Sequence, residues 1–454
     1  MIIFENRRFG LLWAGQLLSN IGGWLMVVAV PVFVYNLTGS VLNTSLAFIA
    51  ETLPAVVLGP FGGVFADRWN RRTTMIYADL VRAAAILPML LVNDRHLVWI
   101  IFVTIFAENT VAQLFQPSHR ALIVSIVGRG AELDAANAWY AISAGVVRVV
   151  GAPLGGALYV LLSFNALVII DSLSYVVSAL ALLLMGGTAT DAVLLPADQK
   201  ATSRGLIAEV REGLRFLAGH RALRGLVAVD ALFLGANGGL NVLLVPFMVS
   251  HLHANADRIG LLMSALGVGY LVSARVGKIA ARSGRFTWNM AGLLAAIAVF
   301  FAALFGIHSF VAALVSIALV GVPGGALLML IQIRLQRDTP DHLLGRISSA
   351  FSTAEMTATV AGALLAGSLA GVLGMTPVIA TAIGVFVLAA ACALVMIPAG
   401  SPTADEPTGT AGIVAQDALE LEVAAEPGVS AASKSPSAAH NRPTDAPTTG
   451  GGTP

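Results

Sequence analysis

The stretch Gly63-Val-Phe-Ala-Asp67-Arg68-Trp-Asn70-Arg71-Arg72 lies between two long apolar runs, and a partial copy, Gly277-Lys-Ile-Ala-Ala-Arg-Ser-Gly-Arg-Phe286, follows 214 residues later. A second pair of similar stretches, Gly151-Ala-Pro-Leu-Gly-Gly-Ala-Leu158 and Gly362-Ala-Leu-Leu-Ala-Gly-Ser-Leu369, is separated by 211 residues. Two unrelated motifs that recur at nearly the same offset indicate an internal duplication. The chain is therefore expected to consist of two similar halves.

The composition indicates a membrane protein. Of the 454 residues, 57% are hydrophobic and only 11% are charged, whereas about 25% of the residues of soluble domains are charged. The mean hydropathy is +0.84. The single cysteine, Cys392, excludes a disulfide framework and a thiolate zinc cluster. The net charge of +1 gives no overall field that would attract nucleic acid.

Apolar runs broken by polar or turn residues predict twelve membrane-spanning helices, since one span takes roughly 20 apolar residues. The sequence thus predicts an all-α polytopic membrane protein with two six-helix, pseudo-symmetric halves. The predicted spans are residues 9–36, 41–65, 73–93, 97–118, 135–162, 165–186, 221–250, 257–277, 286–306, 309–334, 346–372 and 376–397.

Four segments follow from these spans: an N-terminal half (1–186), a linker (187–220), a C-terminal half (221–398) and a tail (399–454). In the linker, Leu206, Val210 and Leu214 recur at helical spacing opposite Arg211, which predicts an amphipathic helix on the membrane surface. The tail is rich in Ala, Pro, Thr, Ser and Gly without an apolar period, so we expect it to be disordered.

The distribution of positive charge predicts the orientation. With both termini in the cytoplasm, 19 Lys and Arg residues lie at cytoplasmic segments and 2 at external loops. Cytoplasmic loops carry an excess of Lys and Arg in membrane proteins. The sequence therefore predicts a multi-pass protein of the cell (inner or plasma) membrane with cytoplasmic termini.

Residues 63–72 resemble the loop G-x-x-x-D-R-x-G-R-R of the major facilitator superfamily, and this resemblance covers about residues 5–398. It implies a gating loop that bridges the halves when the transporter faces outward. Asn70 replaces a glycine, and because asparagine tolerates a positive φ we expect a tight turn there. The alternative is a merely basic cytoplasmic loop. The gating residues implied by the resemblance are Gly63, Asp67, Arg68, Arg71 and Arg72.

Further stretches resemble the exporter branch that includes enterobactin exporters and macrolide efflux pumps. Residues 115–123, Phe-Gln-Pro-Ser-His-Arg-Ala-Leu-Ile, are similar to that branch's F-x-P-A-R-Q-A-L-I element. Span five resembles the G-P-x-x-G-G element of antiporters with its proline displaced by one position. This element implies a helix bend that seals the cavity, and ordinary glycine packing is the alternative. Its residues are Gly145, Gly151, Pro153, Gly155 and Gly156.

Ionisable and amide side chains within spans are the remaining candidates, because a charge in a membrane is costly unless it is paired or hydrated. Asp79 and Arg82 lie three residues apart on one helix face and predict a structural ion pair, and Asp171 is expected to be structural. By the family's geometry, the proton-coupling candidates are Glu108 and Asp230, followed by Glu51 and Glu355. Side-chain packing between helices is the alternative for the amides. The cavity and substrate candidates are Asn109, Gln113, Arg148, Asn237 and Asn241.

These features predict a secondary active transporter that exports amphipathic organic molecules, a drug or a siderophore, in exchange for protons by alternating access. An importer or facilitator of a small solute is the alternative, and a lipid flippase, a membrane-embedded enzyme or a non-transporting sensor is a weaker one. No G-x-x-x-x-G-K-[ST] motif or zinc spacing is present, so we expect neither ATP hydrolysis, nor a cofactor, nor a metal. The expected partners are a small-molecule substrate, protons and membrane lipid, and no nucleic acid. The protein is expected to be a monomer.

Overall fold

The computed structural model describes residues 6–58, 70–186, 219–340 and 343–397, and these form α-helices and short 3₁₀ helices. Twelve of the described helices are long and apolar enough to cross a membrane, which confirms the predicted all-α fold. The first half contains α2 (Arg7–Thr38), α3 (Val41–Leu58), α5 (Arg71–Ile86) with η2 (Leu87–Leu91), η3 (Arg95–Leu97), α6 (Trp99–Val127), α7 (Ala131–Leu162) and α8 (Phe164–Leu184). The second half contains α10 (Arg221–Leu252), α11 (Ala256–Arg282), α12 (Phe286–Gly306), α13 (Phe310–Asp338), α14 (Leu344–Leu373) and α15 (Met375–Met396).

Helix α6 differs most from its predicted span, because it runs nine residues beyond the predicted end at residue 118. Pro117 lies inside the helix and does not terminate it. The additional turns bury Leu122, Ile123 and Val127 in a cluster with residues of α2, α5 and α7. Packing of this apolar face stabilises the helix beyond Pro117, although a proline inside a helix removes a backbone hydrogen bond.

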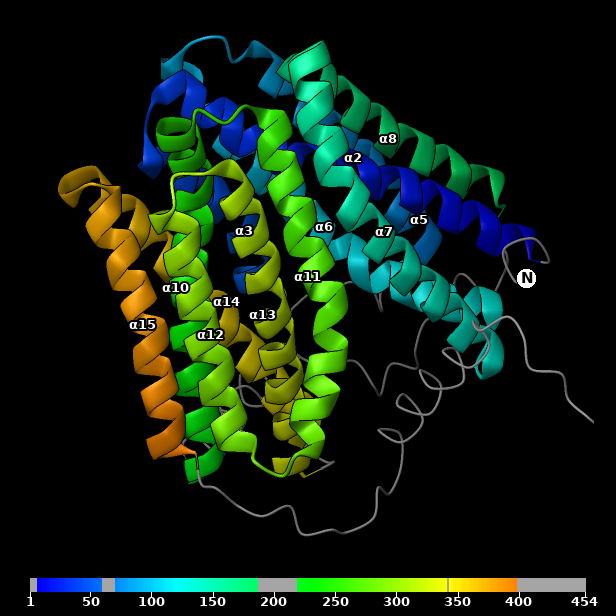
Figure 1. Cartoon of the computed structure of the whole chain (residues 1–454). Coiled ribbons are helices and arrows are strands. Elements are labelled where there is room, and N and C mark those ends of the chain that lie inside the picture. The colour runs from blue at the N-terminus through cyan, green and yellow to red at the C-terminus, as the bar shows by residue number, and fades with distance from the viewer. Residues whose placement is uncertain (1–5, 59–69, 187–218, 341–342, 398–454) are drawn as a thin grey trace, which may run out of the picture. The chain divides into compact units, whose positions relative to one another are not determined.

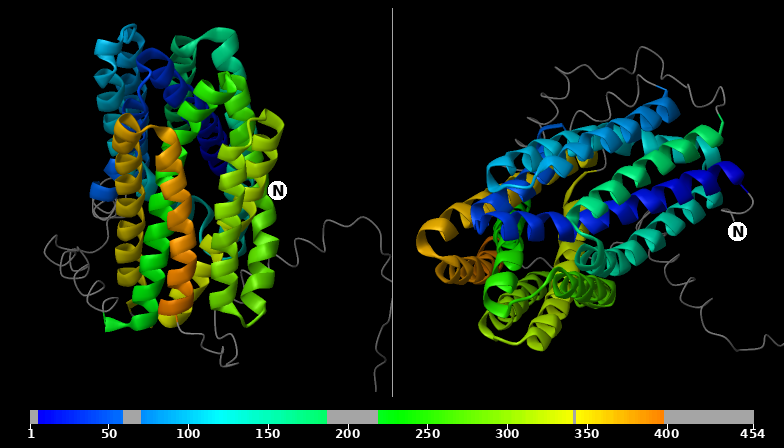
Figure 2. Two further views of the ribbon diagram at one scale, coloured as in Figure 1. Left: turned by 60° about the vertical axis from the view of Figure 1, so that its left-hand side comes forward. Right: turned by 90° about the horizontal axis from the view of Figure 1, so that it is seen from above.

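The same five helix pairs pack within each half. In the first half these are α2–α7, α2–α8, α3–α6, α5–α6 and α5–α8, and in the second α10–α14, α10–α15, α11–α13, α12–α13 and α12–α15. The two halves form separate groups of ribbons, joined where α7 meets α11 and where α3 meets α14 (Figures 1 and 2). When the helices of the two halves are matched in chain order, α7 corresponds to α14 and α3 corresponds to α11. The α7–α11 contact is therefore the counterpart of the α14–α3 contact. The packing therefore repeats as the duplicated motifs predicted.

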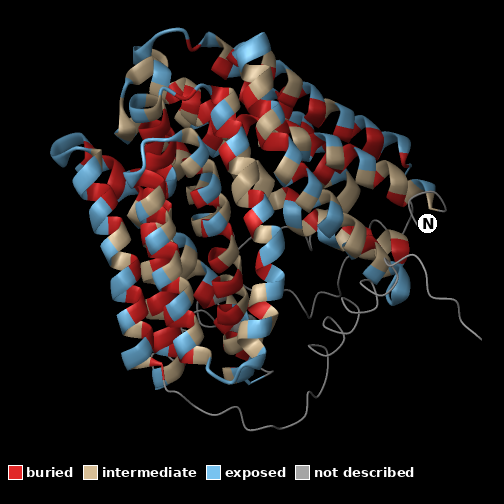
Figure 3. Cartoon of the chain, viewed as in Figure 1, coloured by how far each residue is buried: buried red, intermediate tan, exposed pale blue. Residues whose placement is uncertain are grey.

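Burial distinguishes the inside of the helix groups from their outside. Buried residues lie where helices meet, and exposed residues line the outer surfaces (Figure 3). Many exposed residues are large and apolar, for example Val372 at 83%, Leu184 at 71% and Ile279 at 70% exposure. Exposed apolar side chains at this density suit contact with lipid tails.

The helix ends define two faces of the described residues. We call the face with Asn6, Asn70, Gly128, Gly186 and Ser283 the N-terminal face, and the face with Gly39, Ser163, Ala254 and Gly374 the opposite face. Asn70 does not adopt the positive φ that was the reason to expect a tight turn: its φ is −61°, and its side chain caps α5 by accepting a hydrogen bond from the backbone N–H of Thr73 at 3.0 Å. Asparagine is a favoured helix cap, so the residue that departs from the loop pattern starts the next helix.

Several sequence-based expectations fall outside the described residues. These are Gly63, Asp67 and Arg68 of the gating loop, the linker helix apart from residues 219–220, and the tail. Arg71 and Arg72 are described and lie at the start of α5. Arg72 donates hydrogen bonds to the carbonyl oxygens of Leu182 (2.7 Å) and Leu183 (3.0 Å), and Arg71 donates to that of Ala121 (3.3 Å). Arg72 thus caps the last turn of α8, where a cation is favoured.

Candidate functional site

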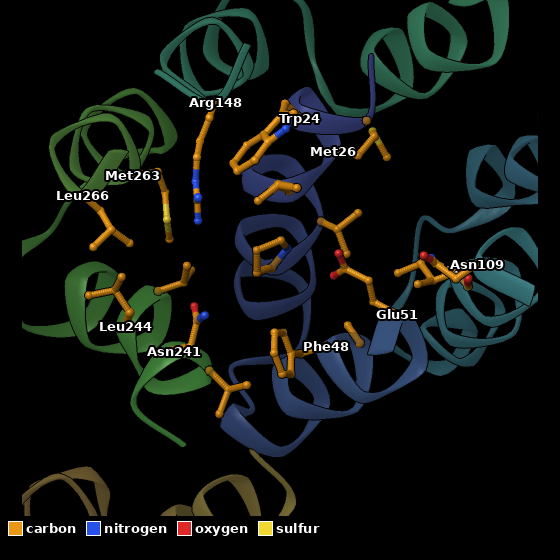
Figure 4. Close-up of a pocket in the computed structure, with 18 of the residues that line it drawn as sticks. Trp24, Met26, Phe48, Glu51, Asn109, Arg148, Asn241, Leu244, Met263 and Leu266 are labelled. Carbon is orange, nitrogen blue, oxygen red and sulfur yellow. Dashed lines mark hydrogen bonds between the residues drawn. The ribbon is translucent and has the colours of Figure 1, made fainter. Parts of the chain in front are cut away.

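A cavity of about 620 Å³ lies between the halves. Its lining comes from α2, α3, α5, η2, α6, α7 and α8 of the first half and from α10, α11, α12 and α13 of the second. This volume falls within the range of small-molecule pockets. Six of the sequence-predicted residues line it: Glu51, Glu108, Asn109, Arg148, Asn237 and Asn241, several of which are drawn in Figure 4.

Glu108 is one member of an ion pair with Arg82. Its Oε1 accepts hydrogen bonds from Nη2 and Nε of Arg82 at 2.7 and 3.0 Å and from the hydroxyl of Tyr175 at 2.8 Å. Its Oε2 accepts one from the side chain of Asn109 at 3.1 Å. The sequence around Glu108 shows no basic neighbour because Arg82 comes from α5, a different helix. Glu108 is therefore already saturated with protein donors.

Two further carboxyl groups lie close to this pair. Asp79 is fully buried, and its Oδ1 lies 3.9 Å from Nη1 of Arg82, so the predicted pair forms but is longer than the one with Glu108. Asp171 is 2% exposed, borders the cavity, and its Oδ1 lies 3.4 Å from the hydroxyl of Ser174. Asp79, Glu108 and Asp171 thus act on the single guanidinium group of Arg82, and Glu51 acts electrostatically on Glu108.

Glu51 lies on α3, and its side chain is exposed to the cavity. It points from α3 toward the space between α2 and α6 (Figure 4). Within the part of the chain that the structure describes, Glu51 makes no hydrogen bond or ion pair, and its electrostatic neighbour is Glu108. A carboxyl group with this surrounding is open to a proton or a cation.

Arg148 lies on α7 and extends into the cavity on the other side of α2 from Glu51 (Figure 4). Its guanidinium carbon lies 4.6 Å from the centre of the Tyr270 ring and 5.8 Å from that of Trp24. Stacking over aromatic rings holds a cation by its attraction to their π-faces. The two walls of the cavity therefore carry opposite charges.

Three of the predicted residues do not line the cavity. The side chain of Gln113 donates a hydrogen bond within its own helix, from Nε2 to the carbonyl oxygen of Asn109 at 3.4 Å. The family's geometry favours Asp230 for the cavity, but its side chain is 1% exposed, does not line the cavity and lies against Glu355. Its Oδ1 has no hydrogen-bond partner among the described residues. Asp230 and Glu355 thus form a carboxyl pair between α10 and α14.

The glycines of the antiporter-like element bring helices together. Gly151 and Gly155 lie against Trp24 and Leu25 of α2, and a methyl group on Gly155 would come within 2.9 Å of the Leu25 backbone. Gly156 lies against the carbonyl oxygen of Ala256 at the start of α11. The element therefore packs α7 on both halves, close to the opposite face.

The F-x-P element joins α6 to its neighbours through aromatic rings. The rings of Phe115 and His119 are 6.0 Å apart, and His119 packs edge-on to Tyr140 of α7 at 5.0 Å. Tyr140 also contacts Phe9 of α2 at 5.9 Å. This motif thus packs α6 against α2 and α7.

Sequence reasoning missed the Trp and Tyr side chains of the cavity, namely Trp24, Tyr175 and Tyr270. The sequence has only six Trp and six Tyr, so a Trp or Tyr in the middle of a span was an available signal. Among the described residues, no group of three or more His, Cys, Asp or Glu side chains is placed to hold a metal ion.

Comparison with known proteins agrees with this architecture. The profile of the Major Facilitator Superfamily matches residues 12–358 and 226–438. The chain is 26% identical over 369 residues to the multidrug efflux pump Tap of Mycolicibacterium fortuitum, covering 79% of this chain and 88% of that protein. It is 24% identical over 270 residues to macrolide efflux protein A of Streptococcus pyogenes, covering 58% of this chain and 64% of that protein.

The fold is also similar to that of a bacterial homologue of the iron transporter ferroportin in its inward-facing state. The TM-score is 0.67 at 17% sequence identity, over 86% of this chain and 98% of the other. At this identity the likeness concerns the fold alone. The matching profile, the twelve apolar helices and the efflux-type relatives lead to one conclusion: the chain is a multi-pass membrane transporter, not an enzyme, and it belongs to the Major Facilitator Superfamily.

Proposed function

We propose that this transporter exports amphipathic organic molecules, of the kind represented by drugs and siderophores, in exchange for protons. The observation that carries the proposal is the cavity between the halves, with the unpaired carboxyl group of Glu51 on its wall. A cavity shared by two pseudo-symmetric halves suits alternating access. The efflux-type relatives support export over import. We further propose that the protein works as a monomer, without nucleic acid as a partner.

A proton carrier must be able to become neutral without leaving a buried charge behind. Glu108 meets this condition poorly, because protonation would leave Arg82 in the membrane without its closest partner. Glu51 has no such partner among the described residues. We therefore propose Glu51 as the first proton acceptor, although its sequence position ranked it below Glu108 and Asp230.

The carboxyl pair of Asp230 and Glu355 is proposed as the second proton site. Two ionised carboxyl groups so close together in a membrane would repel each other, so we propose that one of the two carries a proton in this arrangement. Among the described residues, no other charged group acts on Asp230. Losing the proton would put two negative charges between α10 and α14, which pack closely at Gly235, Gly238 and Gly362.

The direction of access follows from charge and packing. We propose that the N-terminal face is cytoplasmic, as the positive-inside rule predicts. At the opposite face, Gly156 lies against Ala256, and Ser45 of α3 lies against Gly367 of α14. These contacts between the halves support a state closed to the outside. In the outward-facing state, Gly63, Asp67 and Arg68 would bridge the halves, with Arg71 and Arg72 anchoring the loop.

The test is expression in a host that lacks its own efflux pumps. Cells are loaded with an amphipathic anion, cation or neutral compound, and intracellular accumulation is measured with and without a protonophore. The proposal expects lower accumulation of at least one compound, and restoration of accumulation when the proton gradient collapses. Increased accumulation would favour an importer, and gradient-independent equilibration would favour a facilitator.

A further inference from the structure

The position of Arg148 in the cavity wall is defined by contacts with α2 and α11. Its guanidinium carbon lies over the ring of Tyr270 at 4.6 Å and near that of Trp24 at 5.8 Å. Its Cγ lies 3.8 Å from the position that a Cβ on Gly267 would take, so the side-chain stem fills space that this glycine leaves open. Residues of α2, α7 and α11 thus aim one cation into the cavity.

The structure shows no anionic partner of the Arg148 guanidinium group among the residues that it describes. Among the described residues, no hydrogen bond or ion pair involves Arg148, whereas Arg82 binds Glu108 at 2.7 Å. Glu51, the unpaired carboxyl group of the cavity, lies on the other side of α2 (Figure 4). An arginine offers five N–H donors in a planar fork that matches a carboxylate. Donors that the protein leaves unused within a membrane cavity are available to a ligand.

The surroundings of Arg148 are apolar with few polar groups. Met263 and Leu266 of α11 and Leu244 of α10 line the same side of the cavity (Figure 4). Asn241 extends from α10 toward this space and brings an amide group. A ligand that fits this wall combines one acidic group with an apolar or aromatic body.

We propose that Arg148 binds the acidic group of the transported molecule, so the substrate class is an amphipathic organic acid. This inference rests on the proposed function only in taking the cavity as the substrate site. In the bound state the acid accepts hydrogen bonds from the guanidinium fork, and the apolar body packs along Trp24, Met263 and Leu266. The alternative is a structural role, in which Arg148 holds α7 against α2 and α11 by stacking on the rings of Trp24 and Tyr270.

The test is equilibrium binding to purified full-length protein in lipid nanodiscs, without any gradient. The probes are N-dansyl-phenylalanine and its primary amide, a pair in which a carboxylate replaces a neutral amide, and dansyl fluorescence reports binding. Wild type should bind the acid about tenfold to hundredfold more tightly than the amide, the range for a hydrogen bond to a charged group. Arg148→Gln should remove this preference by weakening acid binding alone, and Arg148→Lys should retain part of it.

The matched control is Arg258→Gln. Arg258 is also stacked over a ring, that of Phe310 at 5.4 Å, but it does not line the cavity, so its variant should bind both probes as wild type does. Unchanged binding of the amide to Arg148→Gln shows that the variant is folded. Equal affinity of wild type for both probes, no binding of the acid at millimolar concentration, or full acid binding by Arg148→Gln would overturn the proposal. Because no gradient is present, these outcomes are independent of proton coupling and of the direction of transport.

Discussion

At the scale of single residues, Arg82 is tolerated in the membrane because two other helices supply its partners. Glu108 of α6 lies at 2.7 Å, and the hydroxyl of Tyr175 of α8 lies at 2.8 Å and also binds Glu108. The ring of Tyr175 lies beneath the guanidinium carbon at 4.1 Å. Such a network holds α5, α6 and α8 together, and its members depend on each other.

Replacing one member of this network should therefore destabilise the protein. Glu108→Gln leaves Arg82 without its closest anionic partner, and breaking a buried pair in this way costs about 3 kcal/mol. Thermal unfolding in nanodiscs should show a lower Tm for Glu108→Gln than for wild type. The double variant Arg82→Met/Glu108→Gln should recover most of the loss. The coupling would be contradicted if the loss of Tm in the double variant equalled the sum of the losses in Arg82→Met and Glu108→Gln.

Glu51 differs from Glu108 in having no protein partner among the described residues, so its replacement should affect coupling and not folding. Glu51→Gln should lose concentrative export by at least about tenfold, since an amide carries no exchangeable charge. Exchange of substrate across the membrane at equal pH should persist. Glu132→Gln, the same change at an exposed site in the first turn of α7, is the control and should export normally. Uphill export by Glu51→Gln at the wild-type rate would assign the proton to another group.

If Asp230 and Glu355 share a proton as proposed, they should act as one unit. Asp230→Asn, Glu355→Gln and the double variant should then lose proton-coupled export to the same degree, as measured by substrate efflux against external pH. Non-additivity of this kind is the signature of groups in contact. If the double variant loses as much as both single variants combined, the two residues act separately.

At the scale of helices, apolar runs predict which segments span the membrane, but the partners of their side chains are tertiary. Glu108 appears isolated in sequence because Arg82 is 26 residues away on α5. Asp230 was placed in the cavity from its helix alone, yet the helix has several faces, and this residue lies on the one that packs against α14. Periodicity gives the element, and the rotation of a helix about its axis is set by packing with its neighbours.

The close contacts between α7 and α11 lead to a prediction on access. Gly156→Val would place a side chain against the carbonyl oxygen of Ala256, so closure of the opposite face should become unfavourable. A shift of a few kcal/mol is sufficient to invert a two-state population. In a Cys392→Ser background, Asn237→Cys in the cavity should react faster with a membrane-impermeant thiol reagent from outside when Gly156→Val is present.

The control for this measurement is Gly384→Val. Gly384 lies on α15 with no atom within 4 Å of its Cβ position, so a valine there should leave the labelling rate unchanged. Equal labelling rates for Gly156→Val and Gly384→Val would show that the α7–α11 contact does not close the opposite face.

At the scale of the whole molecule, the two halves share their helix pairing but not their charges. The first half has three carboxyl groups around Arg82, those of Asp79, Glu108 and Asp171, and the second has the Asp230–Glu355 pair, with Arg148 and its ring from α11 between the halves. The duplicated motifs predicted the shared pairing, because similar sequences pack in similar ways. The charges lie outside those motifs, so their arrangement could be seen only in the folded chain. If both proposed proton sites exist, protonation can shift the conformational equilibrium of each half when the cavity changes sides.

The most direct test of proton-coupled transport uses proteoliposomes that contain the purified protein and a pH-sensitive dye. A compound whose accumulation the transporter lowers in cells is placed inside, and a pH gradient is imposed. The account predicts that the compound and protons cross in opposite directions, that each flux requires the other, and that Glu51→Gln abolishes both while compound-for-compound exchange continues. Because exchange has the same sign for either orientation in the bilayer, mixed insertion does not affect the result. Movement of the compound down its own gradient with no change in internal pH would contradict the account.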